Sequence, residues 1–408
     1  MDPDDGAGVT PAETGFAPLF RNRAFLVMWL GQVFSQTADK LVFILLVEIV
    51  GDLSSSPRVM SLALALHTTP NMVLGAIAGV AVDRLDKRSV MVATNVARVV
   101  LVVALGTFGP HALVTAIALA FAISCCAQPF IPAEAAAMPL VVGKAQLLQA
   151  NSMFATTMIG SIILAFTLGE PLVQWLGTRD ASYVTAAGFA VSVAFLACVR
   201  YQFPDQRADE RESFWAQLME GFRYIRGSAA IRRTLVLQVA IFGMFAAMSV
   251  LAIIFAKQVL HANFSWFLAM AGVGLGAGAG VIGQLGSKWN KALIVTLGFM
   301  ACGLSLAALA ASGGRSANMA FAIALVLGIS AALVAVPLQT RLQELVSEEM
   351  RGKVFGAQNT VLNIATTLPL ASAGFLVERL GITEVIGTVG ALMLVAAGWG
   401  WWTRQADV

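Results

Sequence analysis

The sequence has few charged residues. Only 12% of its 408 residues are Asp, Glu, Lys or Arg, and 58% are hydrophobic, whereas a soluble chain has about 25% charged residues. The charges gather into short clusters between apolar runs of about 20 residues, the length of a membrane-spanning helix. The pattern of a transmembrane β-barrel, segments of about ten residues that alternate between apolar and polar, is missing. The composition excludes an ordinary soluble protein and predicts a polytopic, all-α membrane protein.

Cysteine and histidine are also scarce. The four cysteines, Cys125, Cys126, Cys198 and Cys302, lie in apolar runs and have no metal-ligand spacing with the three histidines, so we interpret them as small buried hydrophobes and expect neither metal nor cofactor. The net charge is only +3, and the basic residues lie at expected helix ends, so no nucleic-acid partner is expected. The first twenty residues do not resemble a cleaved signal peptide, so the first span is expected to direct its own insertion.

Motifs for catalysis and for ATP binding are missing as well. The sequence contains no Gly-x-x-x-x-Gly-Lys-Ser/Thr loop, no His-Glu-x-x-His pair and no Gly-x-Ser-x-Gly elbow. The alternate glycines from Gly272 to Gly280 fit close helix packing better than nucleotide binding. We therefore expect no enzyme, and transport, if it occurs, would be driven by an ion gradient or be passive.

Twelve apolar spans are predicted between the charge clusters. About 19 Lys and Arg residues fall on the face that bears both termini and about five on the other, so both termini are expected in the cytoplasm and the protein in the cytoplasmic (inner) membrane. The expected organisation is a tail (1–23), a six-helix bundle (24–200), a linker (201–233), a second six-helix bundle (234–402) and a tail (403–408). The spans are predicted at 24–50, 58–82, 89–109, 112–133, 147–169, 182–200, 234–256, 264–286, 292–312, 317–340, 354–377 and 383–402.

The two halves of the chain repeat each other. The segment that begins QPFIPAEAAAMPLVVGK corresponds to VPLQTRLQELVSEEMRGK, with Pro129 matching Pro337 and Asn151 matching Asn359 at the same separation. A repeat of this size indicates duplication of a six-helix unit, and it predicts a pseudo-twofold axis with a cavity between the halves.

The loop after the second span carries a recognisable motif. Gly79, Asp83, Arg84, Lys87 and Arg88 resemble the Gly-x-x-x-Asp-Arg-x-x-Arg-Arg signature of the major facilitator superfamily. The segment from Ser56 to Arg88, the Pro-rich end of the fourth span, and RLQELVSEEMRGKVFGAQN further resemble the branch of macrolide and siderophore exporters among the drug:proton antiporters, with lysophospholipid transporters as near relatives. The sequence departs from that branch at Glu134, where Arg is common, and in the eroded second signature at 283–291.

The resemblance implies a gate at this loop. Asp83 is expected near the cytoplasmic start of the eleventh span, where the positive end of the helix favours a carboxylate. Arg84 or Arg88 is expected to approach Glu134. The gate residues that we predict are Gly79, Asp83, Arg84, Lys87, Arg88, Glu134, Arg341 and Arg351.

The first span carries a polar stripe. Its members recur at i, i+3, i+4 and i+7 and therefore share one helix face. Charges at mid-helix cost about 2.5 to 3.5 kcal/mol each on insertion scales, so a pathway or a partner is expected for Asp39 and Lys40. As neighbours, these two point about 100° apart and are not expected to pair well. The stripe comprises Gln32, Ser35, Gln36 and Asp39, and Phe43 continues it.

Asp39 matches an acid that many members of the exporter branch carry, which favours proton coupling or substrate binding over a purely structural pair. His67 lies at a depth within about 4 to 5 Å of Asp39. It can share the proton with Asp39 and Lys40, or form a neutral hydrogen bond between helices, which is the more ordinary role. Arg98 can bind an anionic group, snorkel or pair with a carboxylate. Glu48 is expected at the outer interface.

Further substrate contacts are predicted on three other spans, although ordinary helix packing explains the same pattern. The candidates are Asn151 on the fifth span, Gln238, Phe242 and Phe245 on the seventh, and Asn359 and Asn363 on the eleventh. In the linker, Phe214, Trp215, Leu218, Phe222 and Ile225 predict an amphipathic helix on the membrane surface.

These features predict a monomeric secondary transporter that exports a small amphipathic molecule by proton antiport through alternating access within the lipid bilayer. A lysophospholipid transporter of the same fold is the alternative. A membrane sensor or assembly factor that has lost transport is the alternative from a different class, and the intact first signature speaks against it.

Overall fold

The computed structural model describes residues 17–83, 85–142, 146–199, 214–260, 262–285 and 290–405, which contain helices and no strand. The predicted all-α membrane fold is confirmed. The first half comprises α1 (Ala17–Arg21), α2 (Arg23–Leu53), α3 (Pro57–Asp83), α4 (Lys87–Phe108), the short η1 (Gly109–His111), α5 (Leu113–Ala127), α6 (Phe130–Val142) and α7 (Leu147–Ala197). The second half comprises α8 (Phe214–Gly227), α9 (Ala229–Phe255), η3 (Ala256–Leu260), α10 (Phe264–Leu285), α11 (Lys291–Ser312), α12 (Ala317–Leu345), η5 (Glu348–Met350), α13 (Arg351–Leu380) and α14 (Ile382–Gln405).

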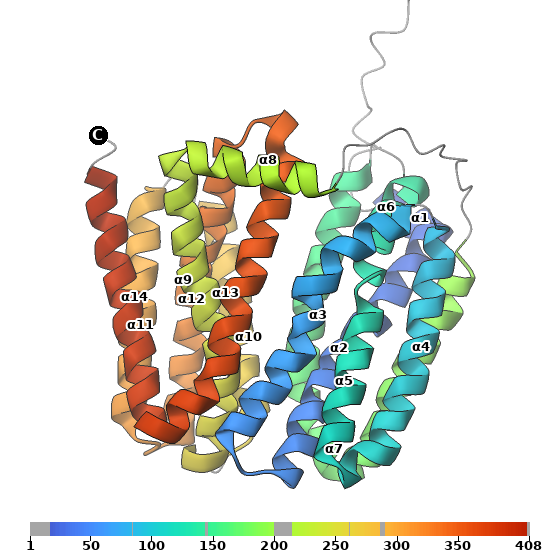
Figure 1. Cartoon of the computed structure of the whole chain (residues 1–408), viewed down its shortest axis with the longest axis horizontal. Coiled ribbons are helices and arrows are strands. Elements are labelled where there is room, and N and C mark those ends of the chain that lie inside the picture. The colour runs from blue at the N-terminus through green and yellow to red at the C-terminus, as the bar shows by residue number, and fades with distance from the viewer. Residues whose placement is uncertain are drawn as a thin grey trace, which may run out of the picture.

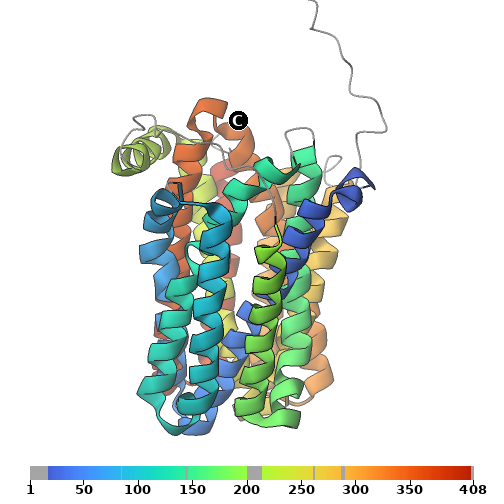
Figure 2. The same ribbon diagram turned by 90° about the vertical axis from the view of Figure 1, so that its right-hand side faces the viewer.

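The two halves stand side by side (Figures 1 and 2). They meet where α13 packs along α3 and where α10 packs along α7. We call the end with α1, α8 and the end of α14 the terminal face, and the other end the opposite face (Figure 1). The long helices of each half run between these two faces.

Each of the twelve predicted spans falls on a helix or a pair of helices. The fourth, expected over 112–133, is divided into α5 and α6, because Pro129 has no N–H with which to continue a helix. The fifth and sixth both lie in α7, which is two helices joined at Gly177, where φ is 78° and ψ is 163°. By length and composition, nine helices of the described residues can cross a membrane; α2 and α3 are not among them. The number twelve therefore stays a prediction.

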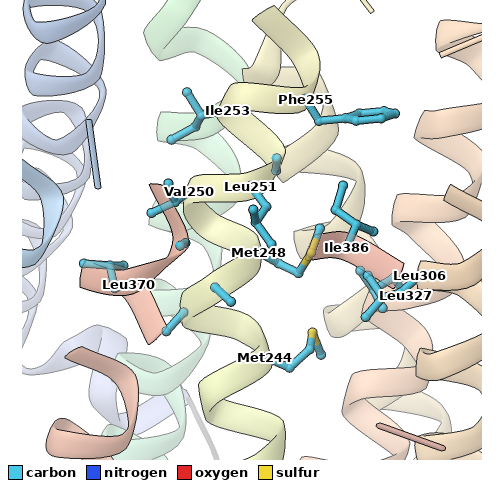
Figure 3. Packing of buried hydrophobic residues seen from close by; sticks show 14 of the residues in the cluster. Met244, Met248, Val250, Leu251, Ile253, Phe255, Leu306, Leu327, Leu370 and Ile386 are labelled. Atoms are coloured by element: carbon cyan, nitrogen blue, oxygen red, sulfur yellow. The ribbon is translucent and has the colours of Figure 1, made fainter. Parts of the chain in front are cut away.

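The hydrophobic core is largest in the second half. Helix α9 runs through its centre and packs against α10, α12, α13 and α14 (Figure 3). Helices α10 and α12 touch backbone to backbone, since a Cβ added at Gly274 would lie 2.1 Å from the carbonyl oxygen of Leu325 and one at Gly328 would lie 2.0 Å from that of Ala271. The glycine-rich segment thus serves close helix packing, as its sequence indicates.

Helix α8 lies across the terminal face of the second half (Figure 1). Leu218 and Ile225 are buried in a cluster with residues of α12 and α13, whereas Trp215 is 66% exposed. An amphipathic helix thus lies where the sequence predicts one, with its buried side against α12 and α13. Its place on the membrane surface stays a prediction. Helix α9 follows it directly and begins at Ala229, five residues before the predicted start of the seventh span.

Candidate functional site

Asp39 lies in a cluster of charges within the first half. Its Oδ1 is 3.7 Å from a guanidinium nitrogen of Arg98, and its Oδ2 is 3.0 Å from Nζ of Lys40. The expectation that adjacent residues would not pair is wrong, because the long, flexible side chain of lysine spans the angular separation. Asp39 therefore lies between two cations.

Arg98 is buried inside the bundle. Its side chain is 3% exposed, and its guanidinium carbon lies 5.0 Å from the ring centroid of Phe130 and 4.7 Å from that of Phe189. These distances are those of cation–π contacts. Its Nη2 also donates to Oγ of Ser35 at 3.3 Å. Of the roles considered for Arg98, pairing with a carboxylate is the one that the contacts show, and snorkelling is not.

A chain of hydrogen bonds extends this cluster across three helices. Oγ of Ser35 donates to Oδ1 of Asn95 at 3.2 Å, Nδ2 of Asn95 donates to Oγ of Ser192 at 2.8 Å, and that hydroxyl donates to the carbonyl oxygen of Gly31 at 2.6 Å. We call Ser35, Asp39, Lys40, Asn95, Arg98 and Ser192 the Arg98 network. Sequence reasoning missed Asn95 and Ser192, although Asn95 lies one helical turn before Arg98.

Three other predicted residues lie near this network without joining it. Glu134 is 6% exposed and its charge interacts with that of Arg98, but the two form no ion pair within 4.0 Å, and Oε1 of Glu134 has no hydrogen-bond partner among the described residues. Oε1 of buried Gln32 is likewise unpartnered there, and Gln36 is half-buried. Glu134 is thus an acid near Arg98 and a second potential partner for it.

His67 does not contact Asp39 directly. Its Nδ1 donates to the carbonyl oxygen of Ala120 at 3.1 Å, which joins α3 to α5, and its ring lies 6.5 Å from that of Phe43 between centroids. This is the interhelical hydrogen bond that we considered the ordinary role. Sharing of a proton with Asp39 stays a prediction.

A cavity of about 380 Å³ opens in the second half. Its volume is in the range that takes a small organic ligand. The predicted substrate contacts Phe242, Asn359 and Asn363 line it, and Phe245 packs on Phe242 with 6.4 Å between ring centroids. Asn151 is exposed and is not part of the lining. The wall is completed by Gln339, Phe355, Gln358, Leu362 and Thr366.

A cluster of three hydrogen-bonded glutamines lies at one wall of this cavity. Nε2 of Gln238 donates to Oε1 of Gln339 at 3.0 Å, and Nε2 of Gln358 donates to Oε1 of both Gln238 and Gln339 at 2.9 Å. Gln238 is fully buried behind the cavity, whereas the other two line it. The cavity therefore has an uncharged hydrogen-bonding wall beside aromatic rings.

The cavity is linked to the first half through α3. Nδ2 of Asn363 lies 3.4 Å from the carbonyl oxygen of Asn71, and Oδ1 of Asn71 accepts from Nε2 of Gln128 at 2.5 Å. A change at the cavity therefore has a path of direct contacts to α3 and to the end of α5.

At the opposite face, charged side chains join the halves. Lys257 and Glu48 pair at 3.0 Å, and Arg58 and Glu378 at 2.7 Å. Glu48, which is expected at the outer interface, contacts the other half through this pair. The backbone N–H of Ser265 also donates to Oε2 of Glu170 at 2.8 Å. The opposite face is thus closed by contacts that sequence reasoning did not predict, because the partners lie far apart in the sequence.

At the terminal face, the structure places only part of the predicted gate. Nζ of Lys87 donates to the carbonyl oxygens of Val82 and Leu85, both at 2.9 Å, at the end of α3, where a cation is favoured. Arg88 is exposed on α4, Arg351 begins α13, and Gly79 lies in α3. Arg341 lines a separate small pocket within the second half. Arg84 and the side chain of Asp83 lie outside the described residues.

We expect the charges of Glu48 and Lys257 to stabilise closure of the opposite face. Reversing one charge, in Glu48→Lys or Lys257→Glu, places like charges in contact and should shift the balance between closed and open forms by about 1 kcal/mol, or about fivefold. The double variant restores an opposite pair and should restore the balance. Distances between spin labels on the two halves at this face measure it, and a double variant no closer to the native distribution than the single ones would contradict the assignment.

Comparison with known proteins agrees with this architecture. Residues 28–369 match the Major Facilitator Superfamily. The chain belongs to this superfamily. It is 24% identical over 394 residues to the uncharacterised MFS-type transporter YfiS of Bacillus subtilis, covering 93% of each chain, and 21% identical over 385 residues to macrolide efflux protein A of Streptococcus pyogenes, covering 91% of this chain and 94% of that protein. Among solved structures, the nucleoside transporter NupG is similar, with a TM-score of 0.75 at 12% identity over 93% of this chain and 99% of that one.

Membership in the superfamily confirms the predicted resemblance. It makes the chain an integral membrane protein of a transporter family with efflux proteins among its relatives. The likeness to NupG concerns the fold alone.

Proposed function

We propose that this facilitator exports a small amphipathic molecule by proton antiport. The observation that carries the proposal is the combination of a cavity for an organic ligand with a separate acid–base cluster in the other half. The cavity has aromatic rings and amides in its wall, and this lining suits a molecule with an apolar body and uncharged polar groups. The similarity to macrolide efflux protein A points to the same class of substrate.

The acid–base cluster supplies the coupling in this proposal. When Asp39 is ionised, it holds Arg98 and Lys40. When it binds a proton, the attraction for both cations is lost, and Arg98 is left near Glu134. Because Arg98 is fixed to α2, α4 and α7 through the network, a proton on Asp39 changes how these helices are held together.

The form described here is the one that loads substrate in this scheme. Contacts between the halves close the opposite face, while the cavity lies along the first five turns of α13, which begins at the terminal face. With both termini in the cytoplasm, the cavity receives substrate from inside the cell, and opening of the opposite face releases it outside.

Proteoliposomes with an imposed pH gradient test this function. We expect drug-like amphipathic molecules to move against their own concentration gradient, in the direction opposite to proton flow. We expect no such accumulation when the proton gradient is collapsed. Transport of lysophospholipids alone would favour the alternative substrate class. Absence of any gradient-dependent transport, with a folded protein, would contradict the proposal.

Phe242 should contribute strongly to binding in the cavity. Phe242→Ala removes an aromatic side chain worth about 2 kcal/mol of apolar contact, so we expect a dissociation constant about 30-fold higher for a transported ligand. Phe108→Ala on α4 is the matched control, because Phe108 is 59% exposed and lies outside the cavity. Calorimetric titration of the purified protein measures both, and equal losses in the two variants would exclude the cavity as the binding site.

A further inference from the structure

A second, smaller pocket lies at the terminal face of the second half. It has a volume of about 50 Å³ and is surrounded by α9, α11, α12 and α14. One water needs about 10–15 Å³ and an organic ligand about 300 Å³ or more, so the pocket admits a compact group of a few heavy atoms. It is too small for the substrate and lies apart from the cavity described above.

Three basic residues line this pocket, one from each of three helices: Arg233 from α9, Lys291 from α11 and Arg341 from α12. Nη1 of Arg233 is anchored to the carbonyl oxygen of Thr403 on α14 at 3.2 Å. Lys291 pairs with the exposed Glu344 at 2.5 Å. Within the described residues, half-buried Arg341 has neither a hydrogen bond nor an ion pair.

The charge in the pocket comes from these side chains. Helices α9 and α11 begin at the pocket and α12 and α14 end there, so the helix dipoles offset one another. The hydroxyls of Thr234, Thr296 and Thr403 donate to carbonyls of their own helices and offer no free hydrogen. The lining thus holds two guanidinium groups and one ammonium, which pairs with the carboxylate of Glu344, over an apolar floor of Leu237, Val295 and Leu338.

We propose that this pocket binds a phosphate group. Two guanidinium groups and an ammonium match a compact oxyanion of charge −1 to −2, because the planar fork of arginine bonds phosphate oxygens in pairs. The pocket also lies at the depth of the membrane interface, since Trp401 and Trp402 flank its lining residues Gly400 and Thr403 on α14 and are 43% and 69% exposed. Both the headgroup of an anionic phospholipid and free cytoplasmic phosphate reach such a position.

The test uses the full-length purified protein and measures thermal unfolding, because a ligand that binds the native state raises the melting temperature. In one arm the protein in detergent is titrated with inorganic phosphate, against chloride at equal ionic strength. In the other, it is placed in nanodiscs of phosphatidylcholine with or without phosphatidylglycerol. A response to phosphatidylglycerol alone identifies a lipid headgroup, and a response to inorganic phosphate identifies a soluble anion; either response supports the proposal if it depends on the pocket.

Variants of the pocket residues show whether the thermal response depends on the pocket. Arg341→Gln and Arg233→Gln should raise the apparent dissociation constant at least about tenfold, the effect of losing a charge-assisted contact. Arg232→Gln is the matched control, since Arg232 is an exposed neighbour of Arg233 that is not in the lining, and it should respond like the native protein. If Arg341→Gln does not fold, Arg341→Lys keeps the charge without the fork and should weaken binding severalfold. No response of the native protein in either arm, or equal responses of the pocket variants and the control, would overturn the proposal.

Discussion

Asp39→Asn should abolish accumulation of substrate driven by a proton gradient, with a loss of at least about tenfold, while substrate binding remains measurable. Asparagine has nearly the size of aspartic acid and keeps a carbonyl oxygen for Lys40, but it neither binds nor releases a proton. The variant therefore remains in one of the two states that Asp39 alternates between, the one in which Arg98 has lost its counter-charge at 3.7 Å. Coupling requires both states.

The measurement is uptake into proteoliposomes with an imposed pH gradient, alongside ligand binding to the purified variant. Asp52→Asn is the matched control, because Asp52 lies on the same helix and is exposed near the end of α2. Native uphill transport by the Asp39 variant would exclude this residue as the coupling site and leave it a structural partner of Arg98. Loss of transport in both variants would show that the readout does not isolate coupling.

Gly374→Ala should keep the opposite face from closing. A Cβ at this position would lie 2.0 Å from the carbonyl oxygen of Pro57 at the start of α3 and 2.4 Å from Oγ of Ser61, and real Cβ atoms do not approach backbone oxygens this closely. Helices α3 and α13 would have to separate, which also stretches the pair between Arg58 and Glu378. We expect transport to fall at least about tenfold and the opposite face to be predominantly open.

Gly356→Ala is the control. Gly356 lies on the same helix as Gly374, but a Cβ added there would have no neighbouring atom within 4 Å, and alanine favours a helix over glycine by about 1 kcal/mol. It should be neutral or slightly stabilising. Spin-label distances across the opposite face and transport rates measure both variants. A native distance distribution in Gly374→Ala would show that the contact between α3 and α13 does not control closure.

The sequence predicts the helices of the fold well, but it predicts less well where one helix ends and the next begins. Each predicted apolar run falls on a helix or a pair of helices, because a bilayer requires about 20 apolar residues wherever a helix crosses it. The breaks depend on single residues. Pro129 divides the fourth span because a proline ends the helix from within an otherwise uniform apolar run, and Gly177 joins two helices without an intervening loop.

The candidate site likewise contains some residues that the sequence predicts and others that it does not. Asp39 and Arg98 stand out in the sequence because charges are expensive inside a membrane, and the structure brings them together. The glutamines at 238, 339 and 358 and the pair of Glu48 with Lys257 do not stand out in this way. Uncharged amides are tolerated for many reasons, and a charge near a helix end is explained by the interface alone, so only the packing of distant segments reveals their partners.

The Arg98 network also bears on how the protein enters the membrane during synthesis. By length and composition, helix α2 is not among the nine helices of the described residues that can cross a membrane. Its two central charges, on Asp39 and Lys40, oppose insertion by about 2.5 to 3.5 kcal/mol each. Its partners Asn95 and Arg98 on α4 and Ser192 on α7 leave the ribosome only after it does. The hydrogen bond to Gly31 forms only after Ser192, 161 residues later in the chain, has been made. We therefore expect the final packing of α2 to depend on synthesis of the whole first half rather than on α2 alone.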